Sequence, residues 1–274
     1  MTATQVGAIE TLDIQALTTG QVISLTTHQI ANGLTTDQVI ALGTQQVQAL
    51  TTGQLVALTT GNIAAIEAGD LASLKTHQIA ALTTSQVALG LTTDQIIALT
   101  TDQVRSLTTG QLTELNSDQL AAIETKDIAA LKTNQVAALT TTQLVQGITT
   151  LQVAALTSAQ IAGLTTAQAA SLTTDQVIAL GSNQVAALTT AQLSGMGTAQ
   201  IAAIETDDIK ALTTGQIGSL TNNQITQGLT TDQVIALQTH QLVALKTSQI
   251  ANGLTTDQIV SLRAAQAASL LPAQ

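Results

Sequence analysis

The sequence predicts an all-α solenoid of short two-turn helices, one per eight-residue repeat, with about 3.3–3.5 repeats in each superhelical turn. Three observations support this fold class. One octad, Leu-Thr-Thr-x-Gln-(Val/Ile/Leu)-x-Ala, recurs from one end of the chain to the other. Its apolar residues fall at helical spacing, and each unit carries the signals that start and stop a helix. A β-solenoid is the alternative, in which Leu, Thr and Gln stack inward as ladders.

The octad sets the helical period, and we label its positions a to h. The aliphatic residue at a recurs at Leu17, Leu25, Leu34 and onward, so residues 1–274 form one continuous array of about 34 units without a separate capping domain. Positions a, e, h and the next a stand at i, i+4, i+7 and i+8, which is one face of a helix. The a-c-e alternation that a strand needs changes phase between e and f, which favours the helix.

The start of each helix is predicted by Thr at b and Gln at e, the S/T-x-x-E/Q capping box. The segment 34–39, Leu-Thr-Thr-Asp-Gln-Val, shows every part of it. The apolar residues at a and f flank the box as in a hydrophobic staple. Position c is Thr or Ser more consistently than b, so a cap at c in some units is the alternative.

The end of the helix is marked by glycine in five units of nine residues. We predict that these glycines turn the chain as left-handed αL C-caps: Gly33, Gly90, Gly147, Gly228 and Gly253. A helix of six or seven residues is unstable alone. Each unit must therefore be held by its neighbours, which is the logic of a solenoid.

A longer period lies above the octad. Four units begin with Ile-Glu and carry Asp instead of Gln at e, and their first residues are Ile9, Ile66, Ile123 and Ile204. These units are seven, seven and ten units apart. With about 3.3–3.5 units per turn those intervals are close to whole turns, so we expect one stripe of acidic units and another of glycine bulges.

The composition excludes several functional classes. The net charge is −10, and there is no Phe, Trp, Tyr or Cys, so nucleic-acid binding, base stacking, disulfides and thiolate chemistry are not expected. No apolar run approaches the roughly 18 residues of a membrane span, and the first residues do not form a signal peptide. No base stands beside a nucleophile and no Gly-rich phosphate loop occurs. We therefore expect neither an enzyme nor a cofactor.

The Ile-Glu units supply the candidate metal ligands. Glu at b and Asp at e lie three residues apart, and Ca²⁺ prefers six to eight oxygen ligands. The alternative, which we favour, is that the carboxylates interact with the dipole of the first helical turn. The candidate residues are Glu10, Asp13, Glu67, Asp70, Glu124, Asp127, Glu205 and Asp208.

The remaining polar residues have simpler interpretations. His28, His77 and His240 fall at the variable position d and are expected to be exposed, as are the lysines at b, which are Lys75, Lys132 and Lys246. The Gln column either forms a repetitive Gln/Thr lattice for ice or a polysaccharide, or caps helices and satisfies backbone groups. We favour the structural role.

Two resemblances follow from these motifs. Residues 34–42, Leu-Thr-Thr-Asp-Gln-Val-Ile-Ala-Leu, resemble the first helix of the repeats in the DNA-binding TAL effectors. The second helix and base-reading loop have no counterpart, and the negative charge opposes DNA binding, so we interpret this as shared capping chemistry. The whole chain resembles the Leu-Thr-Thr-x-Gln-(Val/Ile)-x-Ala arrays of large bacterial surface or secreted proteins, which implies a stalk, adhesin or sheath component.

The ends and the repeats together suggest a structural role. The array begins at position a and stops at e with Gln274, without polar capping repeats, so we expect either a piece of a longer array or open ends that stack head to tail. The predicted function is a structural repeat scaffold, a rod or filament subunit of a bacterial cell surface or extracellular assembly. Its expected partner is itself, end to end or laterally. The alternative is a binding module for ice, polysaccharide or Ca²⁺.

Overall fold

The computed structural model describes residues 1–270, so the last octad position, Gln274, lies outside them. All regular secondary structure in these residues is helical, in 33 short helices. None of these helices is long and apolar enough to cross a membrane. The contacts divide the chain into two units, Met1–Leu139 and Thr140–Gln274. The prediction of one continuous array stays a prediction, whereas the β-solenoid alternative is wrong.

The first unit contains seventeen helices, α1 to α17. Their bounds are α1 (Ala3–Gly7), α2 (Thr11–Ala16), α3 (Thr19–Ser24), α4 (Thr27–Gly33), α5 (Thr36–Ile40), α6 (Thr44–Ala49), α7 (Thr52–Ala57), α8 (Thr60–Ala65), α9 (Ala68–Ala72), α10 (Thr76–Ala81), α11 (Thr84–Gly90), α12 (Thr93–Ala98), α13 (Thr101–Ser106), α14 (Thr109–Glu114), α15 (Ser117–Ala122), α16 (Thr125–Ala130) and α17 (Thr133–Ala138).

The second unit continues with the same kind of helix, and one of them, η1, is a π-helix. The bounds are α18 (Thr141–Gln146), α19 (Thr150–Ala155), α20 (Ser158–Gly163), α21 (Thr166–Ser171), α22 (Thr174–Ile178), α23 (Ser182–Ala187), α24 (Thr190–Gly195), α25 (Thr198–Ala203), α26 (Thr206–Ile209), α27 (Thr214–Ser219), η1 (Gln224–Gly228), α28 (Thr231–Ala236), α29 (Thr239–Leu242), α30 (Thr247–Gly253), α31 (Thr256–Ser261) and α32 (Ala264–Leu270).

Most helices start with the predicted capping box, with position b as the N-cap. The box is absent from α8, where e is Asn62, and from the four Ile-Glu helices, where e is Asp. In α7 the Thr51 hydroxyl accepts from the Gln54 amide at 3.2 Å, and the Gln54 side chain accepts from the Thr51 amide at 2.9 Å. Where b has no hydroxyl the second bond persists, as from the Lys75 amide to Gln78 at 2.7 Å. The Gln side chain therefore holds the box even without Thr, and the alternative cap at c is wrong.

The core consists of the f and a residues with the Gln at e. In one octad Leu55 at f is 0 % exposed, the following Leu58 at a is 4 % exposed, and Gln54 at e is 2 % exposed. The alanine at h, which lies on the same predicted helical face as a and e, is only half-buried in most units, as at Ala57. The apolar core is therefore narrower than the octad pattern predicts, and a polar side chain completes it.

The number of units per turn follows from two kinds of contact. Within the first unit each helix packs on the helix three before it, as α10 does on α7 and α11 on α8. The Gln at e instead bonds to the helix four before, as Gln103 in α13 bonds to Leu74 after α9. A turn therefore holds more than three and fewer than four helices, as predicted.

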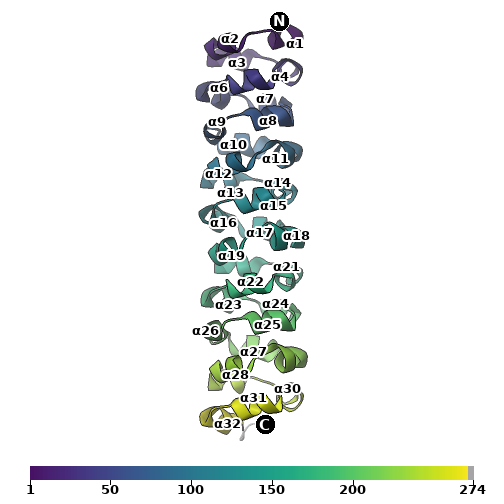
Figure 1. Cartoon of the computed structure of the whole chain (residues 1–274), viewed down its shortest axis with the longest axis vertical. Coiled ribbons are helices and arrows are strands. Elements are labelled where there is room, and N and C mark those ends of the chain that lie inside the picture. Colours follow the sequence, from purple (N-terminus) through teal and green to yellow (C-terminus); the bar gives the residue numbers. More distant parts are fainter. Residues whose placement is uncertain (271–274) are drawn as a thin grey trace. The chain divides into compact units, whose positions relative to one another are not determined.

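This spacing brings the special units of the first unit into columns. In Figure 1, α2, α9 and α16, which carry the Glu/Asp pairs, lie one above another on the left, and the glycine helices α4 and α11 lie on the right. The second unit repeats the same contacts. There α24 packs on α21, and Gln176 bonds to the carbonyl of Leu144 at 2.7 Å.

The five glycines do not adopt the αL conformation that we predicted, because no described residue has a positive φ. Instead the extra residue widens the last turn, and the residue after the glycine donates to the carbonyl five residues earlier. In α11 the Leu91 amide donates to Gln86 at 3.1 Å. The same bond follows the other four glycines, joining Leu34 to Gln29, Ile148 to Gln143, Leu229 to Gln224 and Leu254 to Gln249.

Close packing explains why four of these positions, at Gly33, Gly90, Gly228 and Gly253, are glycine. A Cβ on Gly90 would lie 3.0 Å from Cβ of Ile63 in α8, and one on Gly33 would lie 2.7 Å from the carbonyl oxygen of Ala3. A Cβ on Gly228 or Gly253 would meet an isoleucine at 3.2 or 3.3 Å in the same way. The glycine thus lets the bulged helix approach the helix below it, which is a tertiary requirement rather than a backbone one.

Candidate functional site

The most regular polar feature is a ladder of buried glutamine side chains that joins successive turns. The Gln86 amide group donates to the carbonyls of Leu55 at 2.7 Å and Leu58 at 2.8 Å, both in the turn before it. Its oxygen accepts from the Thr83 amide at 2.9 Å, so both ends of the side chain are used. Carbonyls at a helix end have no partner within the helix, and the ladder supplies one across the turn.

Sequence reasoning identified the capping half of this role and missed the bond across the turn. The signal was present, because position e lies on the same helical face as the aliphatic residue at a, which the apolar pattern predicts to be buried. A nearly constant polar residue on a buried face indicates a satisfied buried hydrogen-bonding group. Since the amides are buried, they are not available as a surface lattice for ice or a polysaccharide.

The ladder is incomplete in the first turn of the array. Gln5 and Gln21 are exposed, whereas Gln38, the first residue with a helix four places before it, is 2 % exposed and donates to Val6 and Ile9. Near the other end of the described chain, Ile259 at position f is 43 % exposed, although f residues inside the units are almost completely buried. An open turn therefore presents amide donors on one face and apolar side chains on the other.

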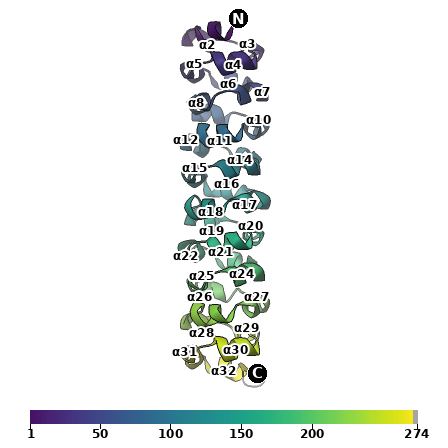
Figure 2. The same cartoon turned by 90° about the vertical axis from the view of Figure 1, so that its right-hand side faces the viewer.

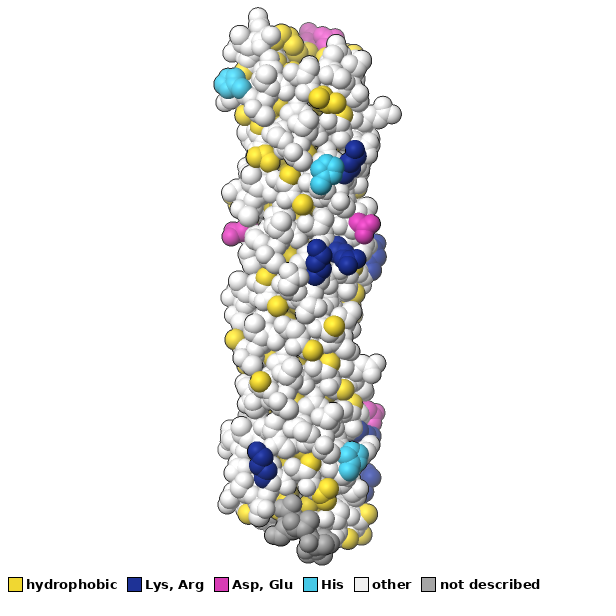
Figure 3. All heavy atoms as spheres, turned by 180° about the vertical axis from the view of Figure 1, so that it is seen from behind, with side chains coloured by type: hydrophobic (Ala, Val, Ile, Leu, Met, Phe, Trp, Pro, Cys, Tyr) yellow, Lys and Arg dark blue, Asp and Glu magenta, His cyan; other side chains and the backbone are white. Residues whose placement is uncertain are grey.

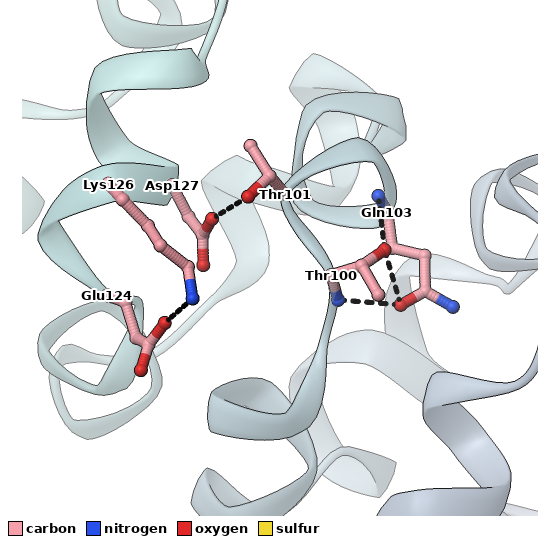
Figure 4. Close-up of polar contacts among 6 residues, drawn as sticks. All are labelled: Thr100, Thr101, Gln103, Glu124, Lys126 and Asp127. Atoms are coloured by element: carbon pink, nitrogen blue, oxygen red, sulfur yellow. Dashed lines mark hydrogen bonds and ion pairs between the residues drawn. The ribbon is translucent and has the colours of Figure 1, made fainter.

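The acidic pairs do not converge on one site, because Asp and Glu point to different environments. Asp70, Asp127 and Asp208 are 9 %, 1 % and 7 % exposed. Each accepts a hydrogen bond from the hydroxyl at position c three helices earlier, namely from Thr44 at 2.6 Å, from Thr101 at 2.5 Å and from Ser182. The aspartate thus replaces the glutamine rung with a bond to a hydroxyl (Figure 4). Asp13, in the first turn, is exposed.

The glutamates of these pairs stay at the surface as N-cap residues without a side-chain cap bond. Glu124 pairs with Lys126 (Figure 4), and this hydrogen bond and charge raise the pKa of Lys126. Glu67 and Asp70 border an open surface hollow of about 430 Å³ beside Thr44. No group of three or more His, Asp or Glu side chains suited to a metal occurs in residues 1–270. The Asp residues lie in first helical turns, where the helix dipole favours them.

The histidines and the lysines at b are exposed, as predicted. The first unit also carries Arg105, which the sequence reasoning did not single out. Seen from behind in Figure 3, basic side chains gather on one face of the upper, N-terminal half, whereas the apolar atoms form scattered spots. Most of the surface repeats from turn to turn. The exceptions are this basic group and the two turns in which Gln21 and Ile259 are exposed.

Comparison with known proteins places the octads in a described repeat. The model of the ALTTAQ repeat matches residues 6–44, 63–101, 120–158, 145–182 and 201–239, which together exceed half of the chain. No curated protein matches. Among solved structures, the chain is similar to the leucine-rich repeat-containing protein LegL7 from Legionella pneumophila, with 11 % identity and a TM-score of 0.23 over 92 % of this chain and 89 % of that one. A score this low carries no argument.

Proposed function

Because the chain belongs to the ALTTAQ repeat family, we propose that it is a structural repeat scaffold. In this role it is an elongated rod or a head-to-tail filament subunit of a bacterial cell surface or extracellular assembly, and it catalyses no reaction. The observation that carries the proposal is the glutamine ladder. Each rung needs only the turn before it, so the same bond can be repeated without limit along an array.

The ladder also has a direction, which supports head-to-tail contact between copies. Each buried glutamine amide donates to the preceding turn, as Gln86 does to Leu58, so helix-end carbonyls accept from the following turn. Gln21 near one end and Ile259 near the other are exposed. Any array of these octads that ends on an open turn therefore presents two different and complementary faces. A contact of this heterologous kind does not close on itself and generates a filament.

Electron microscopy of the purified chain across a concentration series tests this contact. We expect particles of uniform width whose length increases with concentration. Ile259→Lys places a charge on a side chain that stacking would bury and should keep the particles at one length. Val260→Lys is the matched control, because Val260 lies beside it, is 78 % exposed and should leave elongation unchanged.

Two outcomes would count against the proposal. If the wild-type particles keep one length at every concentration, the head-to-tail contact is wrong, and compact particles without a rod-like profile would exclude the scaffold itself. The cellular location needs a separate test. Protease added to intact cells of the source organism should degrade the protein, and degradation only after lysis would rule out a surface or extracellular position.

A further inference from the structure

We propose that the first unit carries a basic face, formed by Lys75, Arg105 and Lys132, which binds the acidic column of a second copy of this chain side by side. The inference rests on the proposed structural role, but it concerns the flanks of the array rather than its ends. The acidic column consists of Glu10, Glu67 and Glu124, the N-cap residues of α2, α9 and α16.

Hydrogen bonds between successive turns place the three basic residues in line. The Ser106 hydroxyl, next to Arg105, donates to the carbonyl of Thr76, next to Lys75, at 3.1 Å. Gln135, in the helix that Lys132 caps, donates to the carbonyl of Arg105 at 3.1 Å. Three consecutive turns therefore each contribute one basic side chain.

The helices of this face also align in the pictures. In Figure 2, α10 and α17 lie along the same right-hand side of the first unit. Lys75, Arg105 and Lys132 are exposed, and none forms an ion pair with another described residue. The basic face is therefore free to meet a partner of opposite charge.

The acidic column repeats with the same period as the basic face. Lys75 and Lys132 are 57 residues apart, as are Glu10 and Glu67, and again Glu67 and Glu124. In each case the interval spans seven helices, such as α10 to α17 or α2 to α9. One step of three helices and one step of four make up this interval, and each step corresponds to one turn. Charges on two copies laid side by side can therefore coincide at more than one point along their length.

This shared period is what makes the contact specific. A single exposed ion pair contributes little, because water and salt screen it and the side chains lose freedom. Several pairs held at one spacing on packed helices act together, as linked binding sites do. The chain has 17 acidic and 7 basic residues, so basic surface is scarce. Any second copy of the chain presents an acidic column that the basic face can bind.

Charge reversal of the basic face tests the proposal in sedimentation velocity. The variant carries three changes, K75E, R105E and K132E. We expect self-association of the wild type at low salt, weaker at high salt where the screening length shortens, and an apparent dissociation constant raised about tenfold or more in the variant. Circular dichroism establishes that the variant remains helical.

The second unit provides a control of the same composition, again two lysines and one arginine. This control carries K210E, K246E and R263E and changes the net charge by the same amount. It should associate like the wild type if the position of the charges matters. If both variants self-associate equally weakly, association depends only on net charge and not on the position of the basic residues, and the proposal would be wrong.

A compensating change completes the test. The acidic-column variant carries E10K, E67K and E124K and should associate poorly by itself, whereas a chain with both sets reversed should associate like the wild type. A wild type that stays monomeric at low salt at all concentrations, or a doubly reversed chain that does not recover, would overturn the proposal. Measured in the Ile259→Lys background, lateral association should survive loss of end-to-end stacking, so the two proposals can fail separately.

Discussion

Replacing one rung of the glutamine ladder tests the main physical account of this fold. In Gln86→Leu the side chain keeps a similar size and stays within a buried position that is 3 % exposed in the wild type. The change removes the donor to the carbonyls of Leu55 and Leu58 and the acceptor for the Thr83 amide. The Leu58 carbonyl and the Thr83 amide then lose their side-chain partner, whereas the Leu55 carbonyl keeps the Leu58 amide at 3.1 Å. Each buried unsatisfied group costs about 1–3 kcal/mol.

The cap and the bond across the turn can be separated within the same chain. Gln21 makes the same capping box with Thr18, at 2.8 Å, but is exposed in the first turn and has no earlier turn to bind. Gln21→Leu therefore loses only the cap. The difference between the two variants isolates the two carbonyl bonds, of which only the bond to Leu58 leaves a carbonyl without its partner. We therefore expect Gln86→Leu to be less stable than Gln21→Leu by about 1–3 kcal/mol.

Urea unfolding followed by circular dichroism gives this difference from the midpoints and slopes. Gln45→Leu, the same substitution at an exposed position d, should stay within about 0.5 kcal/mol of the wild type. If Gln86→Leu and Gln21→Leu differ by less than about 0.5 kcal/mol, the ladder does not hold the turns together and the reasoning is refuted.

A charged analogue gives the same test a pH dependence. In Gln86→Glu the carboxylate faces two carbonyl oxygens in a buried site, so the folded-state pKa of the new carboxyl is raised above its ordinary value. Only the protonated form can donate. Its stability is therefore highest below the ordinary pKa of about 4.3 and is lost as the pH rises through the folded-state pKa. A variant whose stability rises with pH relative to the wild type would contradict this geometry.

Three further substitutions test local features. Gly90→Ala should destabilise the fold by about 1–3 kcal/mol, because the new Cβ meets an isoleucine at 3.0 Å. The control Gly69→Ala places its Cβ in open space and should not destabilise the fold. Equal urea midpoints for the two variants would exclude the close-packing explanation. Asp127→Gln should stabilise by about 1–2 kcal/mol, since it replaces a buried carboxylate with an amide that can donate, and a lower midpoint would refute this. Lys210 lowers the pKa of Asp207 from 3.8 through a hydrogen bond and its charge. The stabilisation from this ion pair is present at pH values above 3.8 and is lost as the pH falls through the folded-state pKa of Asp207. Because the pair is exposed, Asp207→Asn should lower the melting temperature at pH 7 by less than about 1 °C. A larger decrease in melting temperature would contradict this exposed role.

The repeat pattern determined the local structure because its signals act within one octad. Thr at b and Gln at e form their hydrogen bonds three residues apart, and a, f and e lie on one helical face, so the helix, its start and its polarity follow from neighbouring residues. The spacing of the Ile-Glu units also predicted a turn of between three and four helices, which the contacts of α10, α11 and α13 confirm.

Only the tertiary structure decided what touches across a turn. The glutamine amide could be assigned to a cap from the sequence, but its second pair of partners lies about 30 residues away in the chain, as for Gln86 and Leu58. The same distance hid the reason for Gly90, which is the isoleucine beneath it rather than its own backbone. It also hid the burial of Asp127 against Thr101. Local patterns determine hydrogen bonds within a helix, whereas packing between turns depends on the exact pitch, which no single octad encodes.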